Sequence, residues 1–332
     1  METNSSHTII NQQHIVIISQ KNKPKTITTK IKNVMKKLKS IFAITTIAMS
    51  TVFFACQKNE VTIPNSGEQD QEQKNTPSDS SEPGSNEHEL GCIPLPENEY
   101  LQLPQIADKS ETFTQPPSLN LVCPPIRSQG GEGSCVAWGA AYEAFGIAYR
   151  YKHGGAFNNS INIFSPEYVY NQIKAGSSCS SGSYVNNALD LLKSQGACTW
   201  SKMPYSSTNG CSLRPNLSQR ANAASHKIVS WSTVSRNSGA IKKQLSVYKR
   251  PVIIVTPVDE NFDNLGNNQV YTHYSGHYRG YHCYTVVGFD DTKKAFKIMN
   301  SWGTNWASSG FGWISYSAIT TTFCKEAYIL QL

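Results

Sequence analysis

The chain has 332 residues, which is long enough for one domain of ordinary size with flanking segments. Residues 1–56 contain eight lysines and one acidic residue, an excess that equals the whole formal net charge of +7. The rest of the chain is neutral overall, so net charge gives no support for a nucleic-acid partner. Nine cysteines are unusual for a reduced cytosolic enzyme and favour an oxidising compartment.

The N-terminal segments have the pattern of an export signal. Residues 1–34 are polar with no pattern that could bury a core, so we expect an over-extended reading frame or a disordered N-terminus. Met35 opens a basic stretch, and 41–54 is an apolar run that is short for a bilayer span and typical of a signal peptide. We therefore assign 35–56 as a signal peptide.

The signal ends at Ala55-Cys56, which resembles the lipobox of bacterial lipoproteins, although Phe53 departs from the aliphatic residue usual there. We expect lipidation at Cys56 and a membrane anchor through it, hence an exported cell-envelope lipoprotein of a Gram-negative bacterium, facing the periplasm or the cell surface. An ordinary signal peptide and an uncleaved anchor are the alternatives.

Two segments without a core of their own follow the signal. Residues 57–90 are polar, with two basic and eight acidic residues, and are expected to form a disordered linker. Residues 91–118 contain five prolines and are expected to be an extended lead-in that wraps along the surface of the following domain. They contain no sizeable amphipathic helix.

Residues 119–332 are expected to form one α+β domain. Its first half predicts helices: one beginning at Cys135, one begun by Ser165-Pro166-Glu167, and one over 185–194 that Gly196 ends. Its second half predicts one helix over 239–247 and strands over 227–233, 251–258, 284–289, 295–300, 312–315 and 326–330. A site is expected in the crevice between a helical and a β lobe.

The loop 128–134 ends in Cys135, at the first turn of a helix whose apolar residues share one face in α-helical spacing: Trp138, Ala141, Tyr142, Phe145 and Tyr149. The helix dipole favours a thiolate at that end, and the glycines of the loop allow close approach of a ligand. A lone cysteine is more often a small buried apolar residue, so the assignment depends on two later residues.

Those residues are His282 and Asn300. His282 precedes a strand, Asn300 closes the next strand, and the turn 290–294 between them predicts a hairpin that brings the two side chains together. Gln129 lies six residues before the cysteine, and Trp302-Gly303 follows soon after the asparagine. With these neighbours, the order Cys, His, Asn resembles the papain family of cysteine peptidases over about 119–332.

The resemblance implies a papain-like fold with a helical N-terminal lobe, an antiparallel, barrel-like β C-terminal lobe and a cleft between them. It implies Cys135 as nucleophile, His282 as base and Asn300 as the residue that orients the imidazole. Gln129 would stabilise the oxyanion, and no metal or organic cofactor is implied. His273 and His277 are alternative bases, but they lie in a less rigid loop. The spacing of His277, His282 and Cys283 fits no common zinc site.

Five further residues are expected to contact substrate or line the cleft: Gly182, Ser181, Cys283, Trp302 and Trp306. Glu132, Val136 and Ser181 depart from the family pattern. Because Glu132 stands where the family often has a cysteine, Cys179 lacks its usual partner, and we expect a Cys179–Cys211 or a Cys198–Cys211 disulfide.

The sequence therefore predicts a monomeric peptidase that acts on proteins or peptides through a Cys135 thiolate, a His282 imidazolium and an acyl-enzyme. The alternatives are a peptidoglycan amidase or acyl transferase on the same fold, an inactive binding protein of the envelope, and a purely structural envelope protein. An intact set of Cys135, His282, Asn300 and Gln129 argues against the last two.

Overall fold

The structure is a computed structural model that describes residues 88–107, 114–207, 210–319 and 323–332. The predictions for 1–34, for the signal peptide with Cys56 and for nearly all of the linker 57–90 lie outside these residues. Within the described residues, no helix has the length and apolar character needed to cross a membrane.

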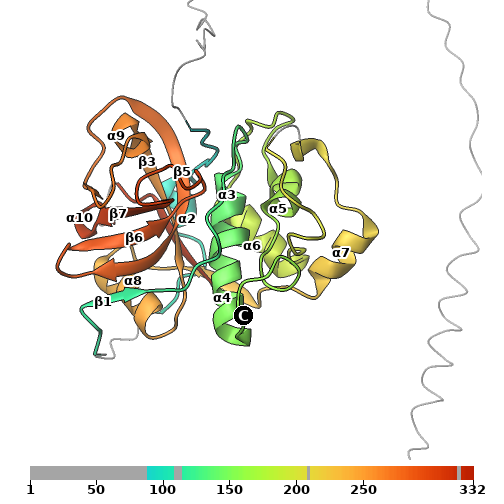
Figure 1. Ribbon diagram of the computed structural model, residues 1–332, viewed down its shortest axis with the longest axis horizontal. Helices are drawn as coiled ribbons and strands as arrows, with labels where there is room; N and C mark the ends of the chain where they lie inside the picture. Colours follow the sequence, from blue (N-terminus) through green and yellow to red (C-terminus); the bar gives the residue numbers. More distant parts are fainter. Residues whose placement is uncertain (1–87, 108–113, 208–209, 320–322) are drawn as a thin grey trace, which may run out of the picture. The chain divides into compact units, whose positions relative to one another are not determined.

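The described residues form a helical lobe and a β lobe side by side (Figure 1). The helices of the first lobe are α3 (Cys135–Ala137), a π-helical stretch (Trp138–Phe145), α4 (Gly146–His153), α5 (Pro166–Ile173), α6 (Val185–Ser194), a short 3₁₀ turn (Gly210–Ser212) and α7 (Leu217–Ala224). The lead-in contributes α2 (Glu97–Tyr100), and α8 (Ser238–Ser246), α9 (Glu260–Asp263) and α10 (Tyr316–Ile319) accompany the strands. This is the papain-like α+β arrangement that the sequence predicts.

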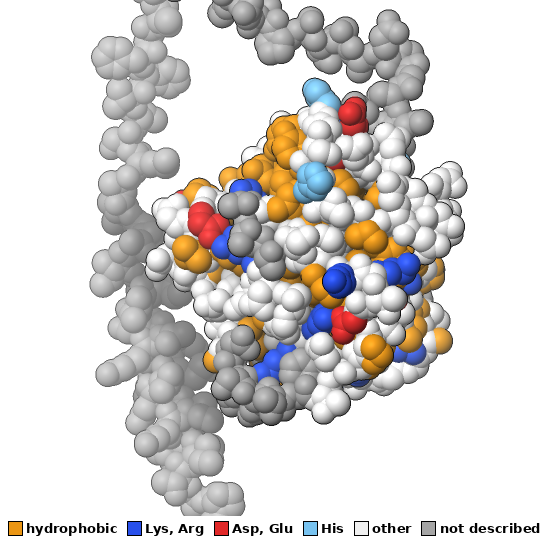
Figure 2. All heavy atoms as spheres, turned by 90° about the vertical axis from the view of Figure 1, so that its left-hand side faces the viewer, with side chains coloured by type: hydrophobic (Ala, Val, Ile, Leu, Met, Phe, Trp, Pro, Cys, Tyr) orange, Lys and Arg blue, Asp and Glu red, His pale blue; other side chains and the backbone are white. Residues whose placement is uncertain are grey.

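The β lobe is one sheet in the order β2-β8-β3-β5-β6-β7-β4, with β1 (Ser118–Asn120) paired to β5. Its strands are β2 (Ser230–Thr233), β3 (Val252–Asp259), β4 (Val270–Tyr271), β5 (Tyr278–Asp290), β6 (Ala295–Met299), β7 (Phe311–Ser315) and β8 (Glu326–Gln331). Within the described residues these strands pair antiparallel, except β4 with β7, which are parallel. On the outer face of this lobe, acidic and basic side chains are interspersed (Figure 2).

The helix that begins at Cys135 differs from the prediction in its winding. Its middle, Trp138–Phe145, is π-helical, so its side chains do not follow the 3.6-residue spacing. Trp138 and Tyr142 pack in the core of the β lobe, whereas Ala141 and Phe145 pack in the core of the helical lobe. The single-face prediction was therefore wrong, because this helix is buried on all sides between the two cores.

Other local predictions agree with the structure. Helix α5 begins after Ser165, whose Oγ accepts from the backbone N–H of Tyr168 at 3.1 Å, and α6 covers 185–194 as expected. Strand β5 begins six residues earlier than the predicted 284. Helix α7 was not predicted, although the side chains of Asn216 and Gln219 form a capping box at its start.

Candidate active site

Cys135 lies at the first position of α3, directly after the glycine-containing loop, and is fully buried. Burial raises the pKa of its thiol to about 12, and hydrogen bonds from the backbone N–H groups of Cys283 and Val136 oppose this rise. The sulfur is therefore a neutral thiol in this form of the protein. The same two N–H groups would stabilise a thiolate once solvent or a cation reached it.

His282 and Asn300 meet at the start of the β5–β6 hairpin, as the spacing predicts. His282 Nε2 and Asn300 Oδ1 are 2.8 Å apart, and Oδ1 also accepts from the Ser301 backbone N–H at 2.8 Å. The asparagine oxygen is thus the acceptor, which places the imidazole proton on Nε2 and leaves Nδ1 to act as a base. Trp302 stacks on the imidazole at 4.4 Å between ring centroids and covers this pair.

Gln129 is fixed so that its amide N–H₂ group faces the site. Its Oε1 accepts from Ser301 Oγ at 2.6 Å, and its Nε2 donates to the carbonyl of Glu132 at 2.8 Å. The same Nε2 also lies 3.1 Å and 3.2 Å from the carbonyl oxygens of Glu89 and Leu90. Ser301 was not among the predicted site residues, although its place next to Asn300 was a usable signal.

These two carbonyls belong to a segment that runs through the site, residues 88–95, which we call the strap. His88 stacks on Trp302 at 4.5 Å, and Trp302 Nε1 donates to the Glu89 carbonyl at 3.3 Å. The Gly91 carbonyl then accepts from the Ser183 N–H at 2.9 Å, and the Ile93 N–H donates to the Ser183 carbonyl at 3.0 Å. The strap therefore pairs with the helical lobe as a short parallel strand.

The strap differs from the surface wrap that the sequence predicted. Cys92 is buried, and Gly91 lies so close to the nucleophile loop that a Cβ on it would be 2.0 Å from the Gly133 carbonyl oxygen. The run Leu90-Gly91-Cys92-Ile93 between polar and proline-rich stretches was the one signal of this burial. Its place in the site depends on backbone atoms, which the sequence pattern does not report.

Burial in the strapped form acts against the predicted ion pair between Cys135 and His282, because it disfavours both charges. Burial lowers the pKa of His282 to about 3, and its Nδ1 has no hydrogen-bond partner among the described residues. Enclosure of both groups away from water favours their neutral forms. Cys135, His282 and Asn300 are thus all buried, and the backbone N–H of Cys283, the neighbour of His282, reaches the Cys135 thiol.

The five residues expected to contact substrate or line the cleft fall into two groups. A Cβ on Gly182 would lie 2.8 Å from Ile93 Cγ1, so a glycine permits close approach here, but the strap pairs with the next residue, Ser183. Cys283 and Trp302 border the site through the contacts described above.

Ser181 and Trp306 bond to other parts of the described chain than the strap. The Ser181 carbonyl accepts from Tyr170 Oη at 2.6 Å, and Trp306 Nε1 donates to the Phe262 carbonyl at 3.0 Å inside the β lobe.

The structure contains the Cys179–Cys211 disulfide, one of the two pairings expected, and Cys198 is a buried free thiol. Glu132 lies beside the disulfide, and its Oε1 accepts from the Cys211 N–H at 3.1 Å. Glu132, Cys179 and Cys211 are close enough together to resemble a metal site. The two sulfurs are bonded to each other, so they are not available as thiolate ligands.

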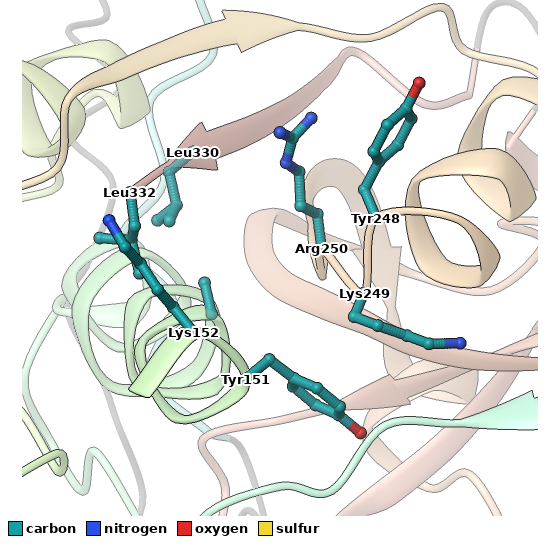
Figure 3. Close-up of a pocket in the computed structure, with 8 residues that line it drawn as sticks. Tyr151, Lys152, Tyr248, Lys249, Arg250, Leu330 and Leu332 are labelled. Carbon is teal, nitrogen blue, oxygen red and sulfur yellow. The ribbon is translucent and has the colours of Figure 1, made fainter. Parts of the chain in front are cut away.

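A separate pocket of about 350 Å³ lies between α4, the turn before β3 and the end of β8 (Figure 3). Lys152 and Arg250 stand on different sides of it, and Tyr151, Tyr248 and Leu332 complete much of the wall. None of the predicted site residues lines this pocket.

A buried cysteine begins the helix between the lobes, and a histidine–asparagine pair lies on the β lobe, which is the papain-like two-lobed arrangement. The family model described as papain family cysteine protease matches residues 116–329. The chain belongs to this family.

Curated relatives and solved structures are also similar to this chain. A gut-specific cysteine proteinase of Caenorhabditis elegans is 30% identical over 212 residues, which cover 56% of this chain and 62% of that protein. Gamete and mating-type specific protein A of Dictyostelium discoideum is 30% identical over 187 residues, or 56% of this chain and 39% of that protein. The chain thus spans less than two thirds of each.

Xylellain, a cysteine protease from Xylella fastidiosa, has a crystal structure that matches with a TM-score of 0.65 at 22% identity. The match covers 74% of this chain and 96% of that chain, and at this identity it supports the fold alone.

Proposed function

We propose that this protein hydrolyses peptide bonds in proteins or peptides through a covalent acyl-enzyme at Cys135. The observation that carries the proposal is the Gln129 amide, which donates to the carbonyls of Glu89 and Leu90 in an enclosed site with Cys135 and His282. A group placed to donate to a peptide carbonyl beside a thiol is the arrangement needed to stabilise a tetrahedral intermediate.

The proposed reaction uses four side chains in turn. His282 Nδ1 takes the thiol proton from Cys135, and the sulfur attacks the peptide carbonyl carbon while Gln129 donates to the developing oxyanion. The imidazolium returns the proton to the amine as the C–N bond breaks. Water, deprotonated by His282, then cleaves the thioester, and Asn300 keeps the ring oriented through both steps.

In this proposal the strap occupies the position of an extended substrate, so hydrolysis requires its displacement. Its carbonyls use the Gln129 donor, and its backbone uses the Ser183 edge. Peptide hydrolysis by the full chain, measured before and after limited proteolysis that cuts within 57–95, tests both points. We expect activity that rises after cleavage, and no hydrolysis in either state would contradict the proposal.

We also propose that the domain is exported and tethered to a membrane by lipid at Cys56. The apolar run 41–54 followed by Ala55-Cys56 and a polar spacer supports this. Labelling expressing bacteria with a fatty-acid analogue tests it. We expect label in the wild type and none in Cys56→Ser, with the Cys56→Ser protein released into the soluble fraction.

A further inference from the structure

Glu132 is a buried acid in the nucleophile loop (128–134), three residues before Cys135, and the proposed reaction does not use its side chain. Its Oε1 accepts from the Cys211 backbone N–H, and a carboxyl oxygen lies within 4.8 Å of both sulfurs of the Cys179–Cys211 disulfide. Its backbone carbonyl accepts from Gln129 Nε2 at 2.8 Å. A single residue thus connects the proposed oxyanion donor to the helical lobe.

The contact with the Glu132 carbonyl differs from the other two contacts of the Gln129 amide. The carbonyls of Glu89 and Leu90 belong to the strap and leave with it, whereas that of Glu132 belongs to the loop itself. The amide Nε2 carries two hydrogens, so one can stay on Glu132 while the other points to a substrate carbonyl. The direction of this donor during the reaction therefore depends on where the Glu132 backbone is held.

The helical lobe holds the loop at both residues of this contact. Tyr205 Oη donates to the Gln129 carbonyl at 2.7 Å, and the Cys211 N–H donates to the Glu132 side chain at 3.1 Å. The acceptor at Gln129 is a backbone carbonyl, whose charge is constant. The acceptor at Glu132 is a carboxyl, so the stability of this second connection depends on protonation.

The surroundings of the Glu132 carboxyl favour its neutral form. Burial raises its pKa to about 7, and the neighbouring Glu167 carboxyl on α5 acts in the same direction. Together they outweigh the Cys211 N–H, which favours the charged form. Glu167 is itself held in place, because its Oε2 accepts from the Ser206 N–H at 3.1 Å. The other titratable groups that face Glu132 are Tyr205, Tyr170 and Lys174.

The neutral carboxyl therefore fits the fixed loop better than the carboxylate does. In a loosened loop the side chain reaches water, and its pKa returns toward the ordinary value of 4.5. The neutral form thus stabilises the fixed loop fully below pH 4.5, and this contribution is lost as the pH rises to about 7. Above that pH, a buried negative charge lies near Glu167 in the fixed loop.

We propose that Glu132 is a positioning residue whose neutral side chain holds the nucleophile loop against the helical lobe, and that this contact keeps the Gln129 amide directed at the substrate carbonyl. The proposal rests on the peptidase function proposed above and adds the residue that positions its oxyanion donor. Glu132 stands where the papain family often has a disulfide cysteine, so a protonated carboxyl takes the place of a covalent link. The loop is then fixed more firmly in acid than in alkali.

Steady-state kinetics with the full chain and a fluorogenic peptide amide separate this role from an effect on the strap. Glu132→Ala removes the acceptor for the Cys211 N–H, so we expect kcat at pH 5 to fall about tenfold or more with little change in KM. Glu132→Gln keeps an acceptor and should stay within about threefold of wild type at that pH. The strap competes with substrate, so a changed affinity for the strap alone would alter KM and leave kcat unchanged. A loss in Glu132→Ala that is confined to KM would overturn the proposal.

The pH profile tests whether protonation of Glu132 matters. The ratio of kcat in wild type to kcat in Glu132→Gln should fall by about threefold or more as the pH rises from 4.5 to 7, because wild type alone gains the buried charge. Dividing the two rates cancels the titration of Cys135 and His282, which both proteins share. Glu99→Gln, an equal change in charge at an exposed position of α2, should give a ratio independent of pH. A ratio independent of pH in Glu132→Gln would overturn the proposal, and this comparison decides if thermal unfolding shows that Glu132→Ala does not fold.

Hydrogen exchange tests the same contact without any hydrolysis. Exchange of the backbone amides of 129–135, corrected for the intrinsic effect of pH, is measured by mass spectrometry in Cys135→Ala and in the Cys135→Ala, Glu132→Gln double variant. We expect protection in the single variant to fall between pH 4.5 and 7, and protection in the double variant to stay constant. This result would support the role of Glu132 even if no peptide is hydrolysed. Constant protection in the single variant would overturn the proposal even if peptides are hydrolysed.

Discussion

The strap and the predicted catalytic residues occupy the same site but are held there by different kinds of contact. The side chains of Gln129, His282 and Asn300 are held by hydrogen bonds among His282, Asn300, Ser301 and Gln129 themselves. The strap is held mainly through its backbone, by the carbonyls of residues 89–91 and the N–H groups of residues 93 and 95. Backbone contacts can be made by any extended peptide, so the strap is replaceable whereas the side-chain set is not. Substitutions in the two regions should therefore act in opposite directions.

Removal of the nucleophile should have the largest effect. Cys135→Ala takes away the atom that forms the acyl-enzyme, so we expect kcat/KM for peptide hydrolysis to fall by at least about 10⁴-fold. Cys198→Ala, another buried free thiol in the same core cluster, is the matched control and should keep its activity per folded molecule. Activity retained by Cys135→Ala would show that Cys135 is not the nucleophile.

Loss of Gln129, the proposed oxyanion donor, should have the next largest effect on activity. Gln129→Ala should lower kcat by about 10²–10³-fold with little change in KM, because its amide acts mainly on the charge that develops during reaction. Ser301→Ala removes only the partner of Gln129 Oε1 and should cost less. Equal losses in the two variants would indicate that Gln129 acts through the loop structure rather than by donating to the substrate.

A substitution in the strap should increase activity. Gly91 has a φ of +132° and lies against the Gly133 carbonyl, so Gly91→Ala adds a clash and backbone strain only in the strapped form. At about 1.4 kcal/mol per tenfold, we expect initial rates to rise by about five- to a hundredfold. Gly154→Ala is the control, since Gly154 also has a positive φ but no neighbour around its Cβ position. An unchanged rate in Gly91→Ala would mean that the strap does not limit access.

The disulfide should affect activity least and stability most. Cys179 and Cys211 are 32 residues apart in sequence, so Cys211→Ser should lower the free energy of unfolding by about 3–4 kcal/mol. Denaturant unfolding measures this change, and peptide hydrolysis at low temperature should stay within a few-fold of wild type. A large loss of kcat in a folded variant would instead give the Cys179 loop a direct part in the reaction.

The sequence is informative for features that are encoded locally. The cap at Ser165, the hairpin between His282 and Asn300, and the alternation from helices to strands all follow from short-range patterns. The lobed fold follows from their order. The π-helical winding after Cys135 was missed because apolar spacing cannot distinguish it in a helix that is buried all round.

The rest of the site depends on contacts between distant segments. The strap meets Gln129 about forty positions away through carbonyl groups that every residue carries, so residue types do not reveal the contact. The roles assigned to Cys135, His282, Asn300 and Gln129 remain predictions whose geometry is compatible with the chemistry.

The most direct test is the rate of alkylation of Cys135 by iodoacetamide as a function of pH, followed by peptide mapping so that each thiol is resolved. In the strapped wild type, burial raises the pKa of this thiol to about 12, so its rate should be low and still rising at pH 9. In Gly91→Ala we expect fast labelling at pH 5–6 that is abolished when His282→Ala is added, as a thiolate–imidazolium pair requires. Labelling in Gly91→Ala that follows an ordinary thiol with a pKa of about 8.5, with or without His282, would contradict the account.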